Sequence, residues 1–123
     1  LKKRKTILLI EDERTIQELI KTILEKEGYK IIPAYSGKEG IEIAEKEKPN
    51  LILLDIFLPD INGIEVCSAI KSNSKTSAIP IIMCTAVQRI GDMDKAIEKG
   101  AADYIMKPLN IEKLKTKVSQ FIS

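Results

Sequence analysis

Residues 6–12 read TILLIED, an apolar run with the length of one β-strand followed directly by two acids. The same arrangement recurs along the chain, where short apolar runs lead into Asp55, Thr85 and Lys107. In an open parallel sheet, the crevice outside the carboxyl ends of the strands is where ligands bind. We therefore expect these side chains to meet at one edge of such a sheet.

Apolar runs of strand length alternate with amphipathic helical patterns over the chain. The predicted strands are Thr6–Ile10, Lys30–Tyr35, Leu51–Leu54, Pro80–Cys84 and Asp103–Met106. This alternation predicts an α/β fold, a single (βα)5 doubly wound parallel sheet of the flavodoxin-like type. Pro33 lacks an N–H, so the second strand should lie at a sheet edge, and the strand order 2-1-3-4-5 satisfies this. That order also places Asp12 beside Asp55.

The composition indicates one globular domain, with 123 residues, 44% hydrophobic residues and a net charge of +2. Residues 1–5 are interpreted as a basic tail or linker remnant, and residues 6–121 as the domain. The balanced charge argues against nucleic acid or membrane binding. We expect Cys67 and Cys84 to be buried thiols. The sequence has no membrane-span or signal-peptide pattern, and we expect the chain to be cytoplasmic. Because it begins with Leu, we expect a fragment of a longer protein.

The residues at the strand ends suit a divalent cation and a phosphoryl group. Carboxylates ~4 Å apart repel by roughly 4 kcal/mol at an effective dielectric of 20, so Glu11, Asp12 and Asp55 need a counter-charge, for which Mg²⁺ is the natural candidate. Lys107 and Thr85 would donate to phosphoryl oxygens, and Asp55 is placed to act as a nucleophile. Each residue alone has an ordinary explanation as the start of a loop or helix. The joint pattern supports the hypothesis.

Four stretches make the sequence resemble the receiver domain of two-component response regulators, from Lys5 to Phe121. They are ILLIEDE at 7–13, LLDIFLPDING at 53–63, CTA at 84–86 and GAADYIMKP at 100–108.

The resemblance implies a phosphorylation-operated signalling switch with Asp55 as the phosphoacceptor. It further implies that Mg²⁺ is bound by Asp12, Asp55 and the backbone carbonyl of Phe57, with Glu11 acting through water. Many family members carry Asp at the position of Glu11, and we expect the longer side chain still to reach a metal-bound water.

The resemblance also implies that Thr85 and Lys107 contact the phosphoryl group and that the Lys107–Pro108 bond is cis. Thr85 and Tyr104 would be the switch residues, which change position on phosphorylation. The output surface would then be the face formed by the fourth helix, fifth strand and fifth helix, where a dimer partner or an effector would bind.

The chain contains no His. The phosphoryl donor must therefore be a histidine kinase, a histidine phosphotransfer protein or a small phosphodonor. We expect no enzymatic activity beyond the chain's own phosphotransfer and dephosphorylation. Phe57 and Val87, two positions after Asp55 and Thr85, are apolar and are expected to hinder the hydrolytic water.

Three other functions compete with this hypothesis. A metal-dependent phosphatase or phosphotransferase would need a second acid two residues after Asp55, where Phe57 stands. A flavin carrier is disfavoured because the acids of residues 11–13 would repel its phosphate. A phosphorylation-independent receiver-like interaction module stays open, because a fold alone does not define a function.

Overall fold

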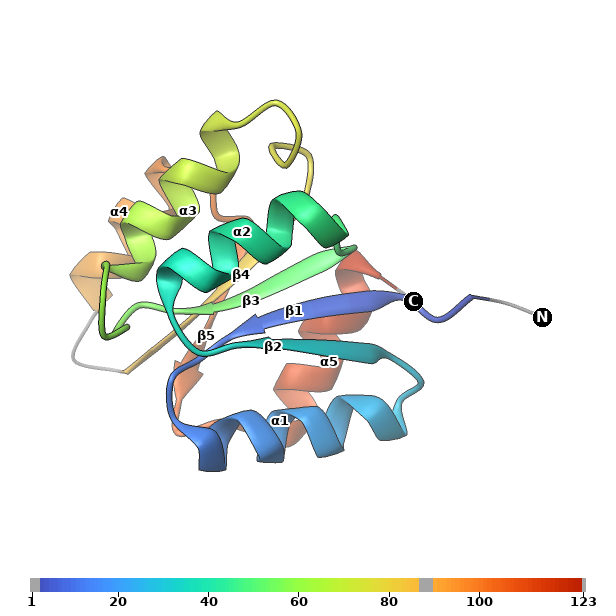
Figure 1. Ribbon diagram of the computed structural model, residues 1–123. Helices are drawn as coiled ribbons and strands as arrows, with labels where there is room; N and C mark the ends of the chain where they lie inside the picture. Colours follow the sequence, from blue (N-terminus) through green and yellow to red (C-terminus); the bar gives the residue numbers. More distant parts are fainter. Residues whose placement is uncertain (1–2, 87–89, 123) are drawn as a thin grey trace.

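The computed structural model describes residues 3–86 and 90–122, in which strands and helices alternate (Figure 1). The strands are β1 (Thr6–Ile10), β2 (Lys30–Ala34), β3 (Leu51–Asp55), β4 (Ile81–Ala86) and β5 (Asp103–Lys107). The helices are α1 (Arg14–Lys26), α2 (Gly37–Glu47), α3 (Gly63–Ser72), α4 (Ile90–Glu98) and α5 (Ile111–Phe121). The predicted (βα)5 order is therefore confirmed.

The strands form one parallel sheet in the predicted order β2-β1-β3-β4-β5. Pro33 lies on β2, which is an edge strand, as expected. Lys30 donates its N–H to the carbonyl of Lys5, and Ala34 accepts from the N–H of Glu11. Because hydrogen-bonding direction alternates along a strand, the nitrogen of Pro33 points away from β1, to the outer side of the edge strand. The sheet requires no donor on that side.

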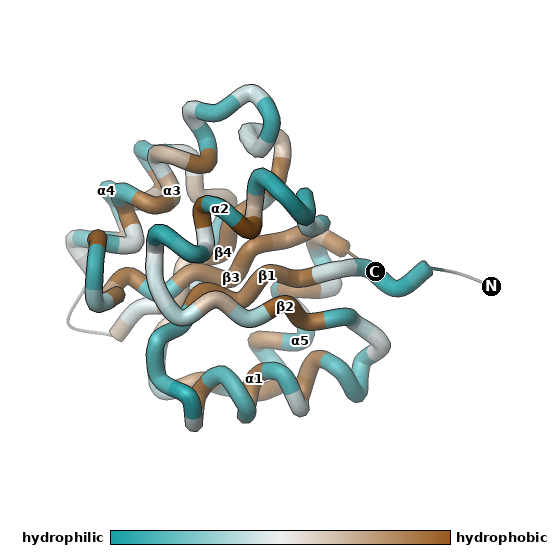
Figure 2. The backbone as a smooth tube through the Cα atoms, viewed as in Figure 1, coloured by the Kyte–Doolittle hydropathy of each residue, from teal (hydrophilic) through white to brown (hydrophobic). Residues whose placement is uncertain are grey.

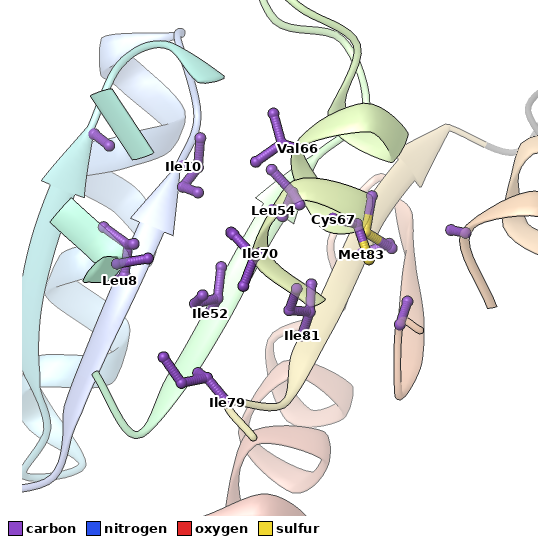
Figure 3. Packing of buried hydrophobic residues seen from close by; sticks show 14 of the residues in the cluster. Leu8, Ile10, Ile52, Leu54, Val66, Cys67, Ile70, Ile79, Ile81 and Met83 are labelled. Atoms are coloured by element: carbon purple, nitrogen blue, oxygen red, sulfur yellow. The ribbon is translucent and has the colours of Figure 1, made fainter. Parts of the chain in front are cut away.

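Each face of the sheet is covered by helices, α1 and α5 on one side and α2, α3 and α4 on the other (Figure 1). Side chains of β1 and β3 alternate between the two cores, whereas β5 buries Ile105 on one face and exposes Tyr104 and Met106 on the other. On β1, Leu8 and Ile10 pack with the α2–α4 layer, whereas Ile7 and Leu9 pack with α1 and α5. Figure 3 shows the first of these cores, and Figure 2 shows the hydrophobic strands between helices with hydrophilic outer faces. Burial on both faces explains why the strands are continuous apolar runs.

The strand ends differ from the predicted ones in a way that matters for function. β3 and β5 end one residue later than predicted, and β4 ends two residues later, whereas β2 ends one residue earlier, at Ala34. In the ladder Asp55 pairs with Cys84, and Lys107 pairs with Ala86. Backbone pairing does not require an apolar side chain, so the apolar runs of β3, β4 and β5 stop short of the strand ends. Asp55 and Lys107 are thus held by the sheet itself rather than by loops.

Local signals in the sequence fix the helix ends. Gly28 and Gly100 follow α1 and α4 with φ of 97° and 108°, a conformation that favours glycine. Ser36 caps α2 by accepting the N–H of Glu39 at 3.2 Å. The Lys107–Pro108 peptide is cis. None of the described helices has both the length and the apolar character needed to cross a membrane.

Both cysteines are free and buried, as expected from their apolar surroundings. Burial raises the pKa of the Cys84 thiol to about 12, so it stays protonated at neutral pH.

Gly63, at the start of α3, packs directly against the backbone of the β3 end. A Cβ at this position would lie 2.1 Å from the carbonyl oxygen of Asp55 and 2.7 Å from the Cα of Ile56. We expect Gly63→Ala to lower the free energy of unfolding by about 1–3 kcal/mol, because rigid backbone must shift to admit the methyl group. Urea denaturation measures this change.

Gly91→Ala on α4 is the matched control, because a Cβ there has no neighbour within 4 Å. It should be neutral or stabilising by up to ~1 kcal/mol through helix propensity. Equal stability changes in the two variants would contradict the close packing at Gly63.

Candidate phosphoacceptor and metal site

The carboxyl ends of β1, β3 and β5 lie at the left of the sheet in Figure 1. Residues at and just after these strand ends line a crevice. Glu11, Asp12 and Asp55 contribute carboxylates to it, and Lys107 contributes an ammonium. Carboxylate oxygens of the three acids lie within 4.8 Å of one another. Adjacent pairing of β1 with β3 brings Asp12 and Asp55 together, although 43 positions of sequence separate them. The predicted convergence of strand ends is thus present for these four residues.

Lys107 lies between two of the acids. Its ammonium is 3.0 Å from Oε1 of Glu11 and 3.3 Å from Oδ2 of Asp55. Both acids are nearly buried, with exposed fractions of 2% for Glu11 and 7% for Asp55, whereas Asp12 is exposed. Among the described residues that line the crevice, Lys107 is thus the one cation beside the three carboxylates of the cluster, and it contacts two of them. The described cluster therefore carries an excess of negative charge.

Burial and charge together set the protonation of this cluster. Burial, followed by the charge of Asp55, raises the pKa of Glu11 to about 7, although the Lys107 ammonium opposes the shift. For Lys107, burial lowers the pKa, but the charges of Asp55 and Glu11 outweigh it, so that the pKa is raised. Lys107 is therefore a permanent cation at neutral pH. Ionising Glu11 is costly until a further cation is present.

The second oxygen of Asp55 is held by the loop that follows β3. Its Oδ1 accepts the backbone N–H of Phe57 at 3.3 Å. The side chain of Phe57 is half exposed and lines the crevice beside Asp55. It therefore stands over the site rather than in the core beneath the loop.

The loop after β3 is itself anchored to α2, a contact that the sequence does not reveal. Asp60 accepts the N–H of Gly37 at 2.8 Å and that of Lys38 at 2.9 Å. The hydrogen bond from Lys38 is the main reason why the pKa of Asp60 is lowered. Residues 57–59 of the crevice are thus held between β3 and the start of α2. An acid beside a proline in a loop is common in sequences, so the sequence alone does not indicate that Asp60 binds the first N–H groups of α2.

Thr85 and Tyr104, the two expected switch residues, lie away from the crevice lining. Thr85 is buried at the end of β4, and its hydroxyl donates to the carbonyl of Ala86 at 3.4 Å. Ala86, not Thr85, lines the crevice. Tyr104 is 37% exposed on β5, and the ammonium of Lys117 lies 5.8 Å from its ring centre. Val87 lies outside the described residues.

Gln17 is a buried polar residue on α1 that the sequence analysis missed. Its amide contacts the backbone at the ends of β1 and β2, including the carbonyl of Glu11 at 3.0 Å. Gln17, Ile20 and Leu24 are the buried residues of α1. A polar residue within an apolar helical stripe was the signal that could have identified it.

Comparison with known proteins agrees with this geometry. A family model described as "Response regulator receiver domain" matches residues 7–119. The response regulator ArlR of Staphylococcus saprophyticus is 42% identical over 112 residues, which are 91% of this chain and 50% of that protein. The chain spans 9% of the length of one relative, the histidine kinase P4 of Formosa agariphila, and 56% of another, the transcriptional regulatory protein CrdR of Helicobacter pylori.

Solved structures give the same result. A putative response regulator from Chloroflexus aurantiacus superposes with a TM-score of 0.92 at 31% identity, covering 97% of this chain and 98% of that one. The receiver domain of the sensor histidine kinase PA1611 from Pseudomonas aeruginosa, described with a magnesium ion coordinated in its active-site cleft, has a TM-score of 0.89 at 28% identity and covers 98% of both chains.

The identity of the fold and its function follow from two findings. One is the acidic cluster with a lysine counter-ion at the carboxyl end of a sheet with the order 2-1-3-4-5. The other is the agreement with the family model and the solved structures. The chain belongs to the response regulator receiver domains, the phosphorylation-operated switches of two-component signalling.

Proposed function

We propose that Asp55 is the residue that accepts the phosphoryl group. The observation that supports this most is the position of its carboxylate, which lies in a crevice with one oxygen bound by the Lys107 ammonium at 3.3 Å. A carboxylate oxygen attacks phosphorus, forming a P–O bond while the P–N bond of the donor phosphohistidine breaks. The imidazole leaves with the electron pair, and Asp55 becomes an aspartyl phosphate.

Lys107 is placed to stabilise the incoming charge. Its ammonium already touches Asp55 and Glu11, so a phosphoryl group on Asp55 arrives within its reach. Pre-positioned cations at developing charge are a large contribution to phosphoryl transfer. Thr85 would have to turn its hydroxyl from Ala86 to the phosphoryl group, which makes it a candidate switch residue together with Tyr104.

The donor set fits Mg²⁺. Three carboxylates within 4.8 Å, offset by one lysine, provide oxygen ligands and excess negative charge. Asp12 and Asp55 would bind the ion with the carbonyl of Phe57, and Glu11 would bind one of its waters. When bound, the ion would neutralise the carboxylates and the phosphoryl oxygens. The magnesium described for the PA1611 receiver domain supports this assignment.

We further infer that this domain is cytoplasmic and that its phosphoryl donor is a histidine kinase or a histidine phosphotransfer protein. The chain has no His of its own, and its relatives include both response regulators and a histidine kinase. In this function the domain catalyses only its own phosphotransfer and the loss of its own phosphoryl group.

For signal output we propose the face formed by α4, β5 and α5. Tyr104, Met106 and Ile111 expose between 37% and 45% of their surface. Lys117 pairs with Asp103 at 2.9 Å next to Tyr104, which adds a charged border to these apolar side chains. An apolar centre with a charged rim is typical of a protein interface, here with a second copy or an effector.

The first test is the site of phosphorylation. After incubation with Mg²⁺ and acetyl phosphate, the intact mass of the wild type should rise by one phosphoryl group, and that of Asp55→Asn should not. Asp60→Asn, in the same loop, is the matched control and should still be phosphorylated. A phosphorylated Asp55→Asn would move the acceptor elsewhere, and an unmodified wild type would favour the phosphorylation-independent interaction module.

The raised pKa of Glu11 predicts a pH-dependent stability in the absence of divalent cations. The folded protein retains a proton on Glu11 up to about pH 7, whereas the unfolded chain loses it near the ordinary glutamate pKa of 4.5. Stability should therefore fall as pH rises through this window, by on the order of 1–3 kcal/mol. Glu11→Gln should remove this slope and be more stable than the wild type above pH ~7.

Urea unfolding with EDTA, followed across this pH range, measures the slope. Saturating Mg²⁺ should restore wild-type stability above neutral pH, because the ion favours the ionised acid, and should help Glu11→Gln less. Parallel slopes in the two proteins would contradict the assignment to Glu11.

The last prediction concerns the lifetime of the aspartyl phosphate. Phe57 places apolar surface at the crevice where a hydrolytic water must line up. Phe57→Asn should accelerate loss of the phosphoryl group by roughly tenfold, part of the ~10²-fold that general-base help supplies. Ile97→Asn, at a half-exposed position on α4, is the control and should decay like the wild type. Unchanged or slower decay in Phe57→Asn would refute a role for Phe57.

A further inference from the structure

Gln17 occupies a position that an apolar residue would ordinarily fill. It lies on the buried stripe of α1 with Ile20 and Leu24, and only 2% of its surface is exposed. The residue faces the end of the sheet at which the acidic cluster lies, one turn into the helix that follows Asp12. Its amide is therefore next to the backbone that carries the acids.

The amide nitrogen of Gln17 is surrounded by three backbone carbonyls. Nε2 donates to the oxygens of Leu9 at 2.9 Å, Glu11 at 3.0 Å and Ala34 at 2.9 Å. An NH₂ group has two hydrogens, so three acceptors share them. These contacts fix the orientation of the amide, because the reversed orientation would direct Oε1 at three carbonyl oxygens.

The other end of the amide has no such partner. Oε1 is the one buried side-chain nitrogen or oxygen without a hydrogen-bond partner in the described part of the chain. An unpaired buried oxygen is unfavourable, and an apolar side chain of similar length would avoid it. The contacts of Nε2 are therefore the feature that distinguishes Gln17 from such an apolar residue.

One of these contacts acts on the proposed metal site. The carbonyl of Glu11 belongs to the peptide group that joins Glu11 to Asp12. A peptide group is planar, so holding its oxygen also fixes the Cα atoms from which both acidic side chains start. The N–H of Glu11 is held as well, by the carbonyl of Ala34 at 3.0 Å, and Ala34 in turn contacts Gln17.

We propose that Gln17 is a positioning residue for metal binding, whose amide orients the Glu11–Asp12 peptide so that both carboxylates face Asp55. This inference rests on the proposed function, in which these acids hold Mg²⁺. Gln17 touches none of the carboxylates and acts through the backbone. Partners of this kind, one step removed from a metal, are known to change metal affinity by 10–100-fold.

The test compares the Mg²⁺ affinity of the wild type with that of Gln17→Met, which keeps length and flexibility but removes the donor. The backbone amide signal of Asp12 in NMR spectra reports binding during a Mg²⁺ titration. We expect Gln17→Met to raise the Kd about tenfold, and Ile20→Val, a buried truncation on the same helix, to change it by less than about twofold. Urea unfolding of both variants shows whether stability accounts for the difference.

Wild-type affinity in Gln17→Met, or an equal loss in Ile20→Val, would overturn the inference. If Gln17→Met does not fold, the side-chain amide signal of Gln17 in NMR spectra of the wild type decides instead. This signal should shift with the same Mg²⁺ midpoint as the backbone amide signal of Asp12. An unshifted signal would overturn the inference. Asp12→Ala separates the two proposals: if it binds Mg²⁺ as the wild type does, the metal site itself is misassigned. If only Asp12→Ala loses affinity, Gln17 alone is misassigned.

Discussion

Electrostatic repulsion at the carboxyl end of the sheet is the constraint on which the site depends. Three carboxylates, two of them nearly buried, converge within 4.8 Å, and in the described part of the chain the Lys107 ammonium is the cation that bridges two of them. At separations of ~4 Å each pair of charges repels by roughly 4 kcal/mol for an effective dielectric of 20. This is comparable to a large part of the net stability of a domain of this size. The rest of the structure must therefore hold the acids together against a force that separates them.

The fold meets this demand with backbone rather than with side-chain contacts between the acids. Asp55 and Lys107 are the last residues of paired strands, so the apolar sheet core fixes their Cα positions. Gly63 closes the following loop by packing on the carbonyl of Asp55, and Asp60 ties the same loop to the start of α2. Because these anchors are uncharged peptide groups or lie outside the cluster, they add little to the repulsion they resist.

Much of this arrangement is predictable from sequence, because it follows from one-dimensional patterns. The topology follows from continuous apolar runs, from Pro33, which requires an edge strand, and from Gly28 and Gly100, which follow helices. This topology brings Glu11 and Asp12 to Asp55. Other features depend on three-dimensional packing that no local pattern encodes. Helical spacing selects Ile97 as a core residue of α4, yet Ile97 is 44% exposed and the adjacent Ala96 is buried. The hydroxyl direction of Thr85 is likewise a rotamer choice among neighbours, which residue type alone does not determine.

On the proposed function, the same constraint links phosphorylation to a change at the protein's surface. A phosphoryl group on Asp55 would add negative charge to a site where Lys107 already contacts two acids, and the ammonium would then redistribute its contacts. Thr85 lies one strand away with its hydroxyl on the backbone of Ala86, and Ala86 pairs in the ladder with Lys107. Met106, the ladder partner of Thr85, is exposed beside Tyr104 on the opposite side from the crevice lining. The β4–β5 ladder therefore joins the charged site directly to the proposed α4–β5–α5 output face, through the pairs Ala86–Lys107 and Thr85–Met106. On the proposed function, the peptide groups keep the backbone of the acids in place, so side-chain atoms would take up the change in charge. The Lys107 ammonium and the Thr85 hydroxyl are two of the side-chain groups in reach.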